Sequence, residues 1–256
     1  MLQTIKKQIC LQKSDWLLGT GCELGMWLMG IAFMLVMQRS DPEDTYVLLG
    51  TIFAIIGSAG VATFIMLYGL GINFNTQISL GNRRTPFLIS YYIAWVAGFF
   101  VYFGILLLVS QGEHAVYASI WAGTAIKEEF DLTRVLLQLG IPVCFVLPAL
   151  GTFCGVLLLR YKRKAFWVLW VLWMLGVFGI PNLMDAADNA VQSTAGKLGL
   201  VLRSVAQFIF GREFPALAVV AAILLLTASW LLLRHQQVEN RDRVVAGYFP
   251  QVADDD

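Results

Sequence analysis

The segment from Val47 to Gly71, VLLGTIFAIIGSAGVATFIMLYGLG, runs for 25 residues without a charged side chain. Roughly 20 apolar residues in a helix are enough to cross the ~30 Å hydrocarbon core of a bilayer. This segment therefore predicts a transmembrane helix. It is followed by a short polar break, QISLGNRRTPFLIS from Gln77 to Ser90, which places Arg83 and Arg84 between two apolar stretches. The break predicts a turn exposed at one side of the membrane.

The whole chain has the composition of a membrane protein. Apolar residues make up 58% of its 256 residues, charged residues make up 14%, and the mean hydropathy is +0.71. A soluble domain rarely reaches such values. We predict an all-α membrane protein with six transmembrane helices, at Gly19–Gln38, Val47–Gly71, Pro86–Ser110, Val135–Leu159, Ala165–Pro181 and Pro215–Leu233.

The distribution of charge predicts the orientation. Basic residues precede the first span and follow spans two, four and six, whereas acidic or mixed residues occupy the other connections. Connections rich in Lys and Arg stay on the cytoplasmic side. We therefore expect a multi-pass protein of the plasma or inner membrane with both termini in the cytoplasm. The basic residues are Lys6, Lys7, Lys13, Arg83, Arg84, Arg160, Lys162, Arg163, Lys164, Arg234, Arg241 and Arg243.

Two further segments have apolar residues at helical spacing. Residues 1–17 predict an amphipathic connecting helix on the inner leaflet, although a positively charged flank that fixes topology explains its lysines equally simply. The connection between spans five and six predicts an outer amphipathic helix, or one that only packs on its neighbours, with apolar positions at Val191, Leu198, Leu202 and Val205. The resulting organisation is a connecting helix at 1–17, a transmembrane domain at 18–234 and a cytoplasmic tail at 235–256.

Catalytic motifs are missing. The sequence has no His-Glu-x-x-His zinc motif, no Gly-x-Ser-x-Gly elbow and no phosphate-binding loop, and its two histidines, His114 and His235, are far apart. Of the four cysteines, Cys10 precedes the first span on the predicted cytoplasmic side and Cys22, Cys144 and Cys154 lie in spans, so we expect small buried hydrophobic residues and no disulfide framework. Glu23 is the one carboxylate within a span, and its shallow position favours an interfacial or helix-pairing residue over a proton carrier. We expect no enzymatic activity, no cofactor or metal bound by this chain, and no nucleic-acid partner.

Aromatic residues are concentrated in spans three and five. Such faces accommodate amphiphilic or peptide cargo through adaptable apolar contacts, which makes them candidates for a substrate path. Interfacial belts and helix packing are the simpler explanation. The candidates are Tyr92, Trp95, Phe99, Trp170 and Trp173.

The N-terminal amphipathic segment, the break SLGNRRTPF from Ser79 to Phe87 and the terminal SWLLLR from Ser229 to Arg234 together resemble the membrane subunits of ABC-2 type transporters. The likeness is to the small six-span bacterial permeases. It implies that the break is a coupling helix that sits in a groove of a separate ATPase subunit. The residues in that position are Ile78, Ser79, Leu80, Gly81, Asn82, Arg83 and Arg84.

The same resemblance implies partners and a mechanism. ATP and Mg would be bound by the ATPase, a second permease subunit, identical or related, would complete the pathway in the bilayer, and the pair would export a hydrophobic or amphiphilic substrate that is peptide, lipid-like or drug-like. Positive-inside charge alone also explains Arg83 and Arg84. Two other classes stay open, namely a non-transporting immunity, sensor or assembly protein, and a passive channel or ion-coupled carrier.

Overall fold

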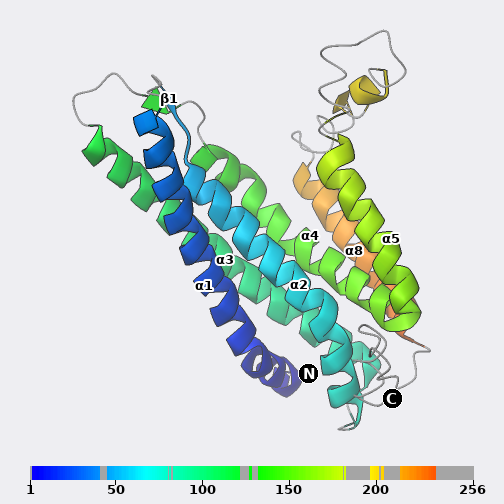
Figure 1. The fold of residues 1–256 in the computed structure, drawn as a ribbon. Coiled ribbons are helices and arrows are strands. Elements are labelled where there is room, and N and C mark those ends of the chain that lie inside the picture. The colour runs from blue at the N-terminus through cyan, green and yellow to red at the C-terminus, as the bar shows by residue number, and fades with distance from the viewer. Residues whose placement is uncertain are drawn as a thin grey trace, which may run out of the picture. The chain divides into compact units, whose positions relative to one another are not determined.

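The protein is almost entirely helical in its computed structural model, which describes residues 2–40, 45–79, 81, 83–121, 127–128, 132–180, 182, 197–201, 203–204 and 214–234. Short stretches at 197–201 and 203–204 are helical as well. The main elements (Figure 1) are the α-helices α1 Leu2–Ser40, α2 Leu49–Ser79, α3 Arg84–Ile120, α4 Leu132–Tyr161, α5 Arg163–Met174 and α8 Phe214–Leu233, the π-helical turn η1 Leu175–Gly179, and the strands β1 Thr45–Tyr46 and β2 Lys127–Glu128.

Five of the described helices, α1, α2, α3, α4 and α8, are long and apolar enough to cross a membrane. The chain is therefore a helical membrane protein. The fifth predicted span, Ala165–Pro181, corresponds to the 12-residue α5 and the five-residue η1 that continues it. A π-helical turn interrupts the regular α-helix there. The count of six spans is accordingly not confirmed.

Two helices are longer than their predicted spans. α1 runs through residues 17 and 18 as one helix of 39 residues, so no break separates the predicted connecting helix from the first span. α3 reaches Ile120, whereas the sequence predicted that a connection begins at Gln111. The polar run from Gln111 to His114 is therefore helical, and its Glu113 is buried.

The chain forms two compact units. The first contains the described residues of Met1–Met66 and Thr85–Pro148, and the second those of Leu67–Arg84 and Ala149–Asp256. Helices α2 and α4 thus contribute to both. The first unit holds the packing of α1 on α2 and α3, and the second holds the predicted coupling turn, the second half of α4, and α5, η1 and α8.

In the first unit, α1 buries one narrow face. Its six buried described residues are separated alternately by four and seven positions, so the pattern repeats every 11 residues. An 11-residue repeat corresponds to 3.67 residues per turn, close to the 3.6 of a straight α-helix. One helix can therefore keep the same face on its neighbours over three repeats. The buried residues are Gln8, Gln12, Gly19, Glu23, Gly30 and Met34.

The same repeat is visible in the residue types. WLLG at Trp16–Gly19 recurs as WLMG at Trp27–Gly30, 11 positions later. A Cβ on Gly98 would lie 2.7 Å from Nε1 of Trp16, and one on Gly112 would lie 3.7 Å from the ring of Trp27. Each tryptophan of the repeat therefore rests on a glycine of α3. Because both residue numbers rise together, α1 and α3 run parallel.

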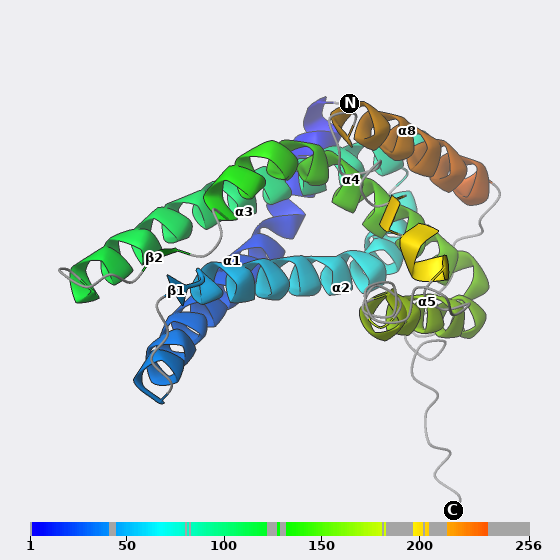
Figure 2. The same ribbon diagram turned by 90° about the horizontal axis from the view of Figure 1, so that it is seen from above.

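In the first unit, the connection between α1 and α2 pairs with the connection between α3 and α4. Thr45 and Tyr46 of β1 pair in parallel with Lys127 and Glu128 of β2, and Figure 2 shows the two short strands next to each other. Beside them the ring of Tyr117 lies 5.2 Å from that of Tyr46 and 4.8 Å from that of Trp121, between centroids. This pair of strands was not predicted, since two residues are too few to form a recognisable pattern.

Candidate functional site

The predicted coupling stretch is a tight helical hairpin in the second unit. α2 ends at Ser79, Gly81 has a φ of 86°, and α3 begins at Arg84. The backbone N–H of Gly81 donates to the carbonyl of Ile78 at 3.0 Å, which closes the end of α2. A left-handed residue after a helix is the usual glycine terminus. Leu80 and Asn82 lie outside the described residues.

The two arginines of this hairpin have different surroundings. Arg84 is half-buried, and its Nη1 donates to the carbonyl oxygen of Arg234, just after α8. Arg83 is exposed and has no hydrogen bond or ion pair with any described residue. The pair therefore divides into one arginine used within the fold and one presented to the surroundings.

A second arginine reaches the same end of α8. Nη1 of Arg160, from the last turn of α4, donates to the carbonyl of Leu232 at 3.1 Å. The guanidinium of Arg234 lies over the ring of Trp230, 5.8 Å from its centroid. The carboxyl end of a helix has unpaired carbonyls and the negative end of its dipole, so cations stabilise it.

These contacts bring together the basic residues that follow predicted spans two, four and six. We refer to this set as the basic end, and it consists of Arg83, Arg84, Arg160, Lys162, Arg163, Lys164 and Arg234. Most of them are exposed. Lys162 is the single residue between α4 and α5, and its φ of 50° and ψ of −128° show a strained corner that turns the chain back. The grouping agrees with the segregation of charge along the sequence.

The aromatic residues predicted for a substrate path belong to different units. In the first unit, Trp95 and Phe99 are buried and form part of a ladder on α3, with ring centroids 6.4 Å apart. Tyr92 is half-buried, and its hydroxyl donates to the carbonyl of Phe145 at 3.3 Å. Trp170 and Trp173 lie in the second unit and are exposed.

Phe99 also lines a cavity of about 240 Å³ in the first unit, between α2, α3 and α4. Its other lining residues are almost all apolar, with Ser58 and Tyr102 as the polar exceptions. Trp95 and Tyr92 do not line it. Among the predicted aromatics of the first unit, packing within the helix bundle therefore accounts for Trp95 and Tyr92, whereas Phe99 also borders this partly open cavity.

The outer amphipathic helix can be assessed at one position. Leu198 lies in the helical stretch 197–201 and is exposed. Val191, Leu202 and Val205 lie outside the described residues, as do His235 and the predicted tail at 235–256. The predicted amphipathic face therefore stays a prediction.

Three buried polar residues lie on α1, and of these the sequence analysis singled out Glu23 but missed Gln8 and Gln12. The side-chain oxygen and nitrogen atoms of Gln8 and Gln12, and both carboxylate oxygens of Glu23, are buried without a hydrogen-bond partner among the described residues. All three lie on the 11-residue face of α1. Glu23 is thus enclosed between helices rather than placed at the interface with lipid. The spacing of the repeat was the signal that would have located them.

No group of three or more His, Cys, Asp or Glu suitable for a metal ion occurs among the described residues. Nδ1 of His114 lies 3.3 Å from the hydroxyl of Tyr46. The four cysteines are free thiols, with Cys10 exposed and Cys144 buried. No family model, curated protein or solved structure matches this chain.

Proposed function

We propose that this chain is the non-catalytic membrane subunit of an ABC transporter, driven by a separate ATPase that docks at the hairpin between α2 and α3. The observation that carries this proposal is the difference between the surroundings of the two arginines. Arg83 is exposed on the turn, while Arg84 is tied to the end of α8. The hairpin therefore exposes the guanidinium of Arg83 on a turn that Arg84 connects to the end of α8.

The geometry favours mechanical coupling. A soluble partner with an acidic groove is attracted by Arg83, and the remaining exposed cations of the basic end extend the same field. Movement of the hairpin is passed to α8 through Arg84, and α4 contacts the same helix end through Arg160. Closure of the ATPase would therefore displace several membrane helices together. ATP and Mg are bound by that partner and not by this chain.

The proposed transporter lies in the plasma or inner membrane with the basic end and both termini in the cytoplasm. α5 and η1 form its fifth span, since 17 residues reach about 25 Å and lie at the short end of the transmembrane range. Six spans are few for a complete pathway, so a second identical or related subunit completes it. The cargo is hydrophobic or amphiphilic, and the direction is export.

Reversal of one charge tests the proposal. Arg83→Glu is expected to lower the amount of ATPase that co-purifies with the chain by about tenfold, because attraction becomes repulsion. Arg39→Glu, an exposed arginine in the last turn of α1, provides the matched control and should have no effect. The amount of folded protein in the membrane should be equal in all three samples.

Two results would contradict this assignment. If Arg83→Glu and the unaltered chain co-purified with the same amount of ATPase, the hairpin would not be the coupling site. If no ATPase co-purified with the unaltered chain, and no cargo moved in vesicles supplied with ATP, the non-transporting class would take its place. Flux that persists without ATP would favour a channel or an ion-coupled carrier.

A further inference from the structure

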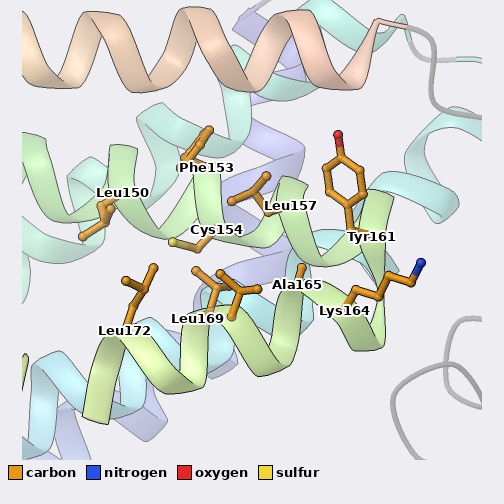
Figure 3. A pocket seen from close by; sticks show the side chains of 10 residues that line it. Leu150, Phe153, Cys154, Leu157, Tyr161, Lys164, Ala165, Leu169 and Leu172 are labelled. Atoms are coloured by element: carbon orange, nitrogen blue, oxygen red, sulfur yellow. The ribbon is translucent and has the colours of Figure 1, made fainter. Parts of the chain in front are cut away.

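A surface groove of about 440 Å³ runs along α4 and α5 in the second unit. Figure 3 shows its lining side chains in two rows, one from each helix, with Leu150 and Leu172 at one end and Tyr161 and Lys164 at the other. Every other residue between these ends is apolar or Cys. The groove therefore combines an apolar length with a single cationic end.

The dimensions of the groove fit one acyl chain. Leu150 and Tyr161 are 11 positions apart on α4, which corresponds to roughly 17 Å along the helix axis. Half of a ~30 Å hydrocarbon core has about the same depth. Leu150, Val168 and Leu172 are 43%, 59% and 58% exposed, so the groove opens at the surface of the unit. An alkyl chain lying there would cover them.

The polar end of the groove carries a positive charge that no described residue pairs with. Lys164 is exposed and has no ion pair or hydrogen bond with any described residue. Tyr161 begins at the same end, but its hydroxyl points away from α5 and from Lys164 (Figure 3), and the guanidinium of Arg160 lies 5.6 Å from the centroid of its ring. Arg160, Lys162 and Arg163 add further cations within four positions. An anionic headgroup complements this arrangement, whereas a zwitterionic one does so less well.

We propose that this groove binds one anionic phospholipid, with an acyl chain along α4 and α5 and the phosphate at Lys164. The positive charge at the Lys164 end of the groove fits an acidic headgroup. The length and apolar lining of the rest of the groove fit an acyl chain. Basic pockets beside transmembrane helices recognise acidic headgroups in this manner. The groove lies outside the predicted coupling hairpin, although Lys164 also belongs to the basic end, and the lipid experiment below needs no ATPase.

Cys154 lines the groove and supplies a direct probe. The full-length protein is placed in nanodiscs of phosphatidylcholine alone, or in nanodiscs that also contain phosphatidylglycerol with the same acyl chains. The rate at which Cys154 reacts with a membrane-permeant maleimide is then measured by mass spectrometry of the peptides. Phosphatidylglycerol should slow the reaction of Cys154, while exposed Cys10, which does not line this groove, should react at an unchanged rate.

Two matched variants distinguish the groove from general surface charge. Lys164→Gln should weaken the protection of Cys154 by phosphatidylglycerol by about fivefold, the effect of removing one cation near an acidic lipid surface. Arg163→Gln removes the same charge from the neighbouring exposed position, which does not line the groove, and should weaken the protection clearly less than Lys164→Gln does. Native mass spectrometry of the detergent-solubilised proteins should show the same order of phosphatidylglycerol retention.

The remaining outcomes overturn the proposal. Equal protection by phosphatidylcholine would mean that the headgroup charge is not recognised, and equal loss in the two variants would assign the effect to the surface as a whole. Protection by inorganic phosphate without acidic lipid would replace the phospholipid by a soluble anion. Protection that depends only on protein concentration would assign the groove to a second copy of the chain.

Discussion

The carboxylate of Glu113 accepts two hydrogen bonds from Thr51, one from its backbone N–H at 2.7 Å and one from its hydroxyl at 2.8 Å. The N–H of Gly50 donates to the other carboxylate oxygen at 2.9 Å. α2 begins at Leu49, so Glu113 satisfies amide groups in the first turn of that helix from a position near the end of α3. An acidic group at a helix N-terminus is stabilised by the helix dipole.

Removing this carboxylate should destabilise the protein. Glu113→Ala leaves buried donors of Gly50 and Thr51 unpaired, and we expect the free energy of unfolding in mixed micelles to fall by about 2 kcal/mol. Gln111→Ala is the control, since it truncates an exposed side chain of the same helix. An equal decrease in the free energy of unfolding in both variants would show that the hydrogen bonds between Glu113 and α2 do not add to stability.

Close approach of α1 and α2 at Gly30 and Gly50 predicts a second effect on stability. A Cβ at Gly30 would lie 2.5 Å from the Cα of Gly50 and 2.7 Å from the carbonyl oxygen of Leu49, and backbone atoms yield little. Gly30→Ala should therefore cost about 1–3 kcal/mol, seen as a lower midpoint of thermal unfolding.

Gly25 provides the matched control for that substitution. It lies on the same helix, and a Cβ there would meet nothing within 4 Å. Gly25→Ala should be neutral or slightly stabilising, because alanine favours the helix over glycine by up to about 1 kcal/mol. If Gly30→Ala were tolerated as well as Gly25→Ala, the two helices would have to be farther apart than described.

The bond from Arg160 to Leu232 predicts local protection at the end of α8. Arg160→Gln removes a cation from the carboxyl end of that helix, so its last turn should open more often. We expect amide hydrogen exchange at residues 230–234 to become about fivefold faster, equivalent to about 1 kcal/mol. Arg163→Gln should leave these rates unchanged, and equal acceleration by both variants would argue against a specific contact.

Cys10 allows the predicted orientation to be measured. It is exposed near the N-terminal end of α1, which the charge pattern places in the cytoplasm. A membrane-impermeant maleimide should label it in inside-out vesicles and not in intact cells. Cys10→Ser should abolish that signal, while buried Cys144 stays unmodified in both preparations. Labelling of Cys10 in intact cells would reverse the topology and the proposed side of the coupling hairpin.

Helices whose ends coincide with changes in composition were predictable from the sequence. The predicted span Pro215–Leu233 differs from α8 Phe214–Leu233 by one residue, because charged residues flank an unbroken apolar run. The extension of α3 to Ile120 was not predictable in this way. Its polar run resembles a loop until the pairing of Glu113 with α2 is known, and the two partners are more than 60 positions apart.

The same distinction applies to the candidate site. Hydropathy and charge located the break at Arg83 and Arg84, but they treat the two arginines as equivalent. Their different roles depend on a contact between Arg84 and Arg234, 150 positions apart, which leaves no local pattern. The buried amides of Gln8 and Gln12 were not singled out from the sequence, although they lie on the 11-residue repeat of α1.

The length of α1 and α3 affects how movement at one end of these helices reaches the other end. Helices of 39 and 37 residues extend about 58 and 55 Å, nearly twice the thickness of the apolar layer. Trp16 and Trp27 each pack on a glycine of α3, so α1 and α3 are two parallel helices in contact, and neither is interrupted. We therefore expect a tilt imposed at one end of this helix pair to move the other end as well.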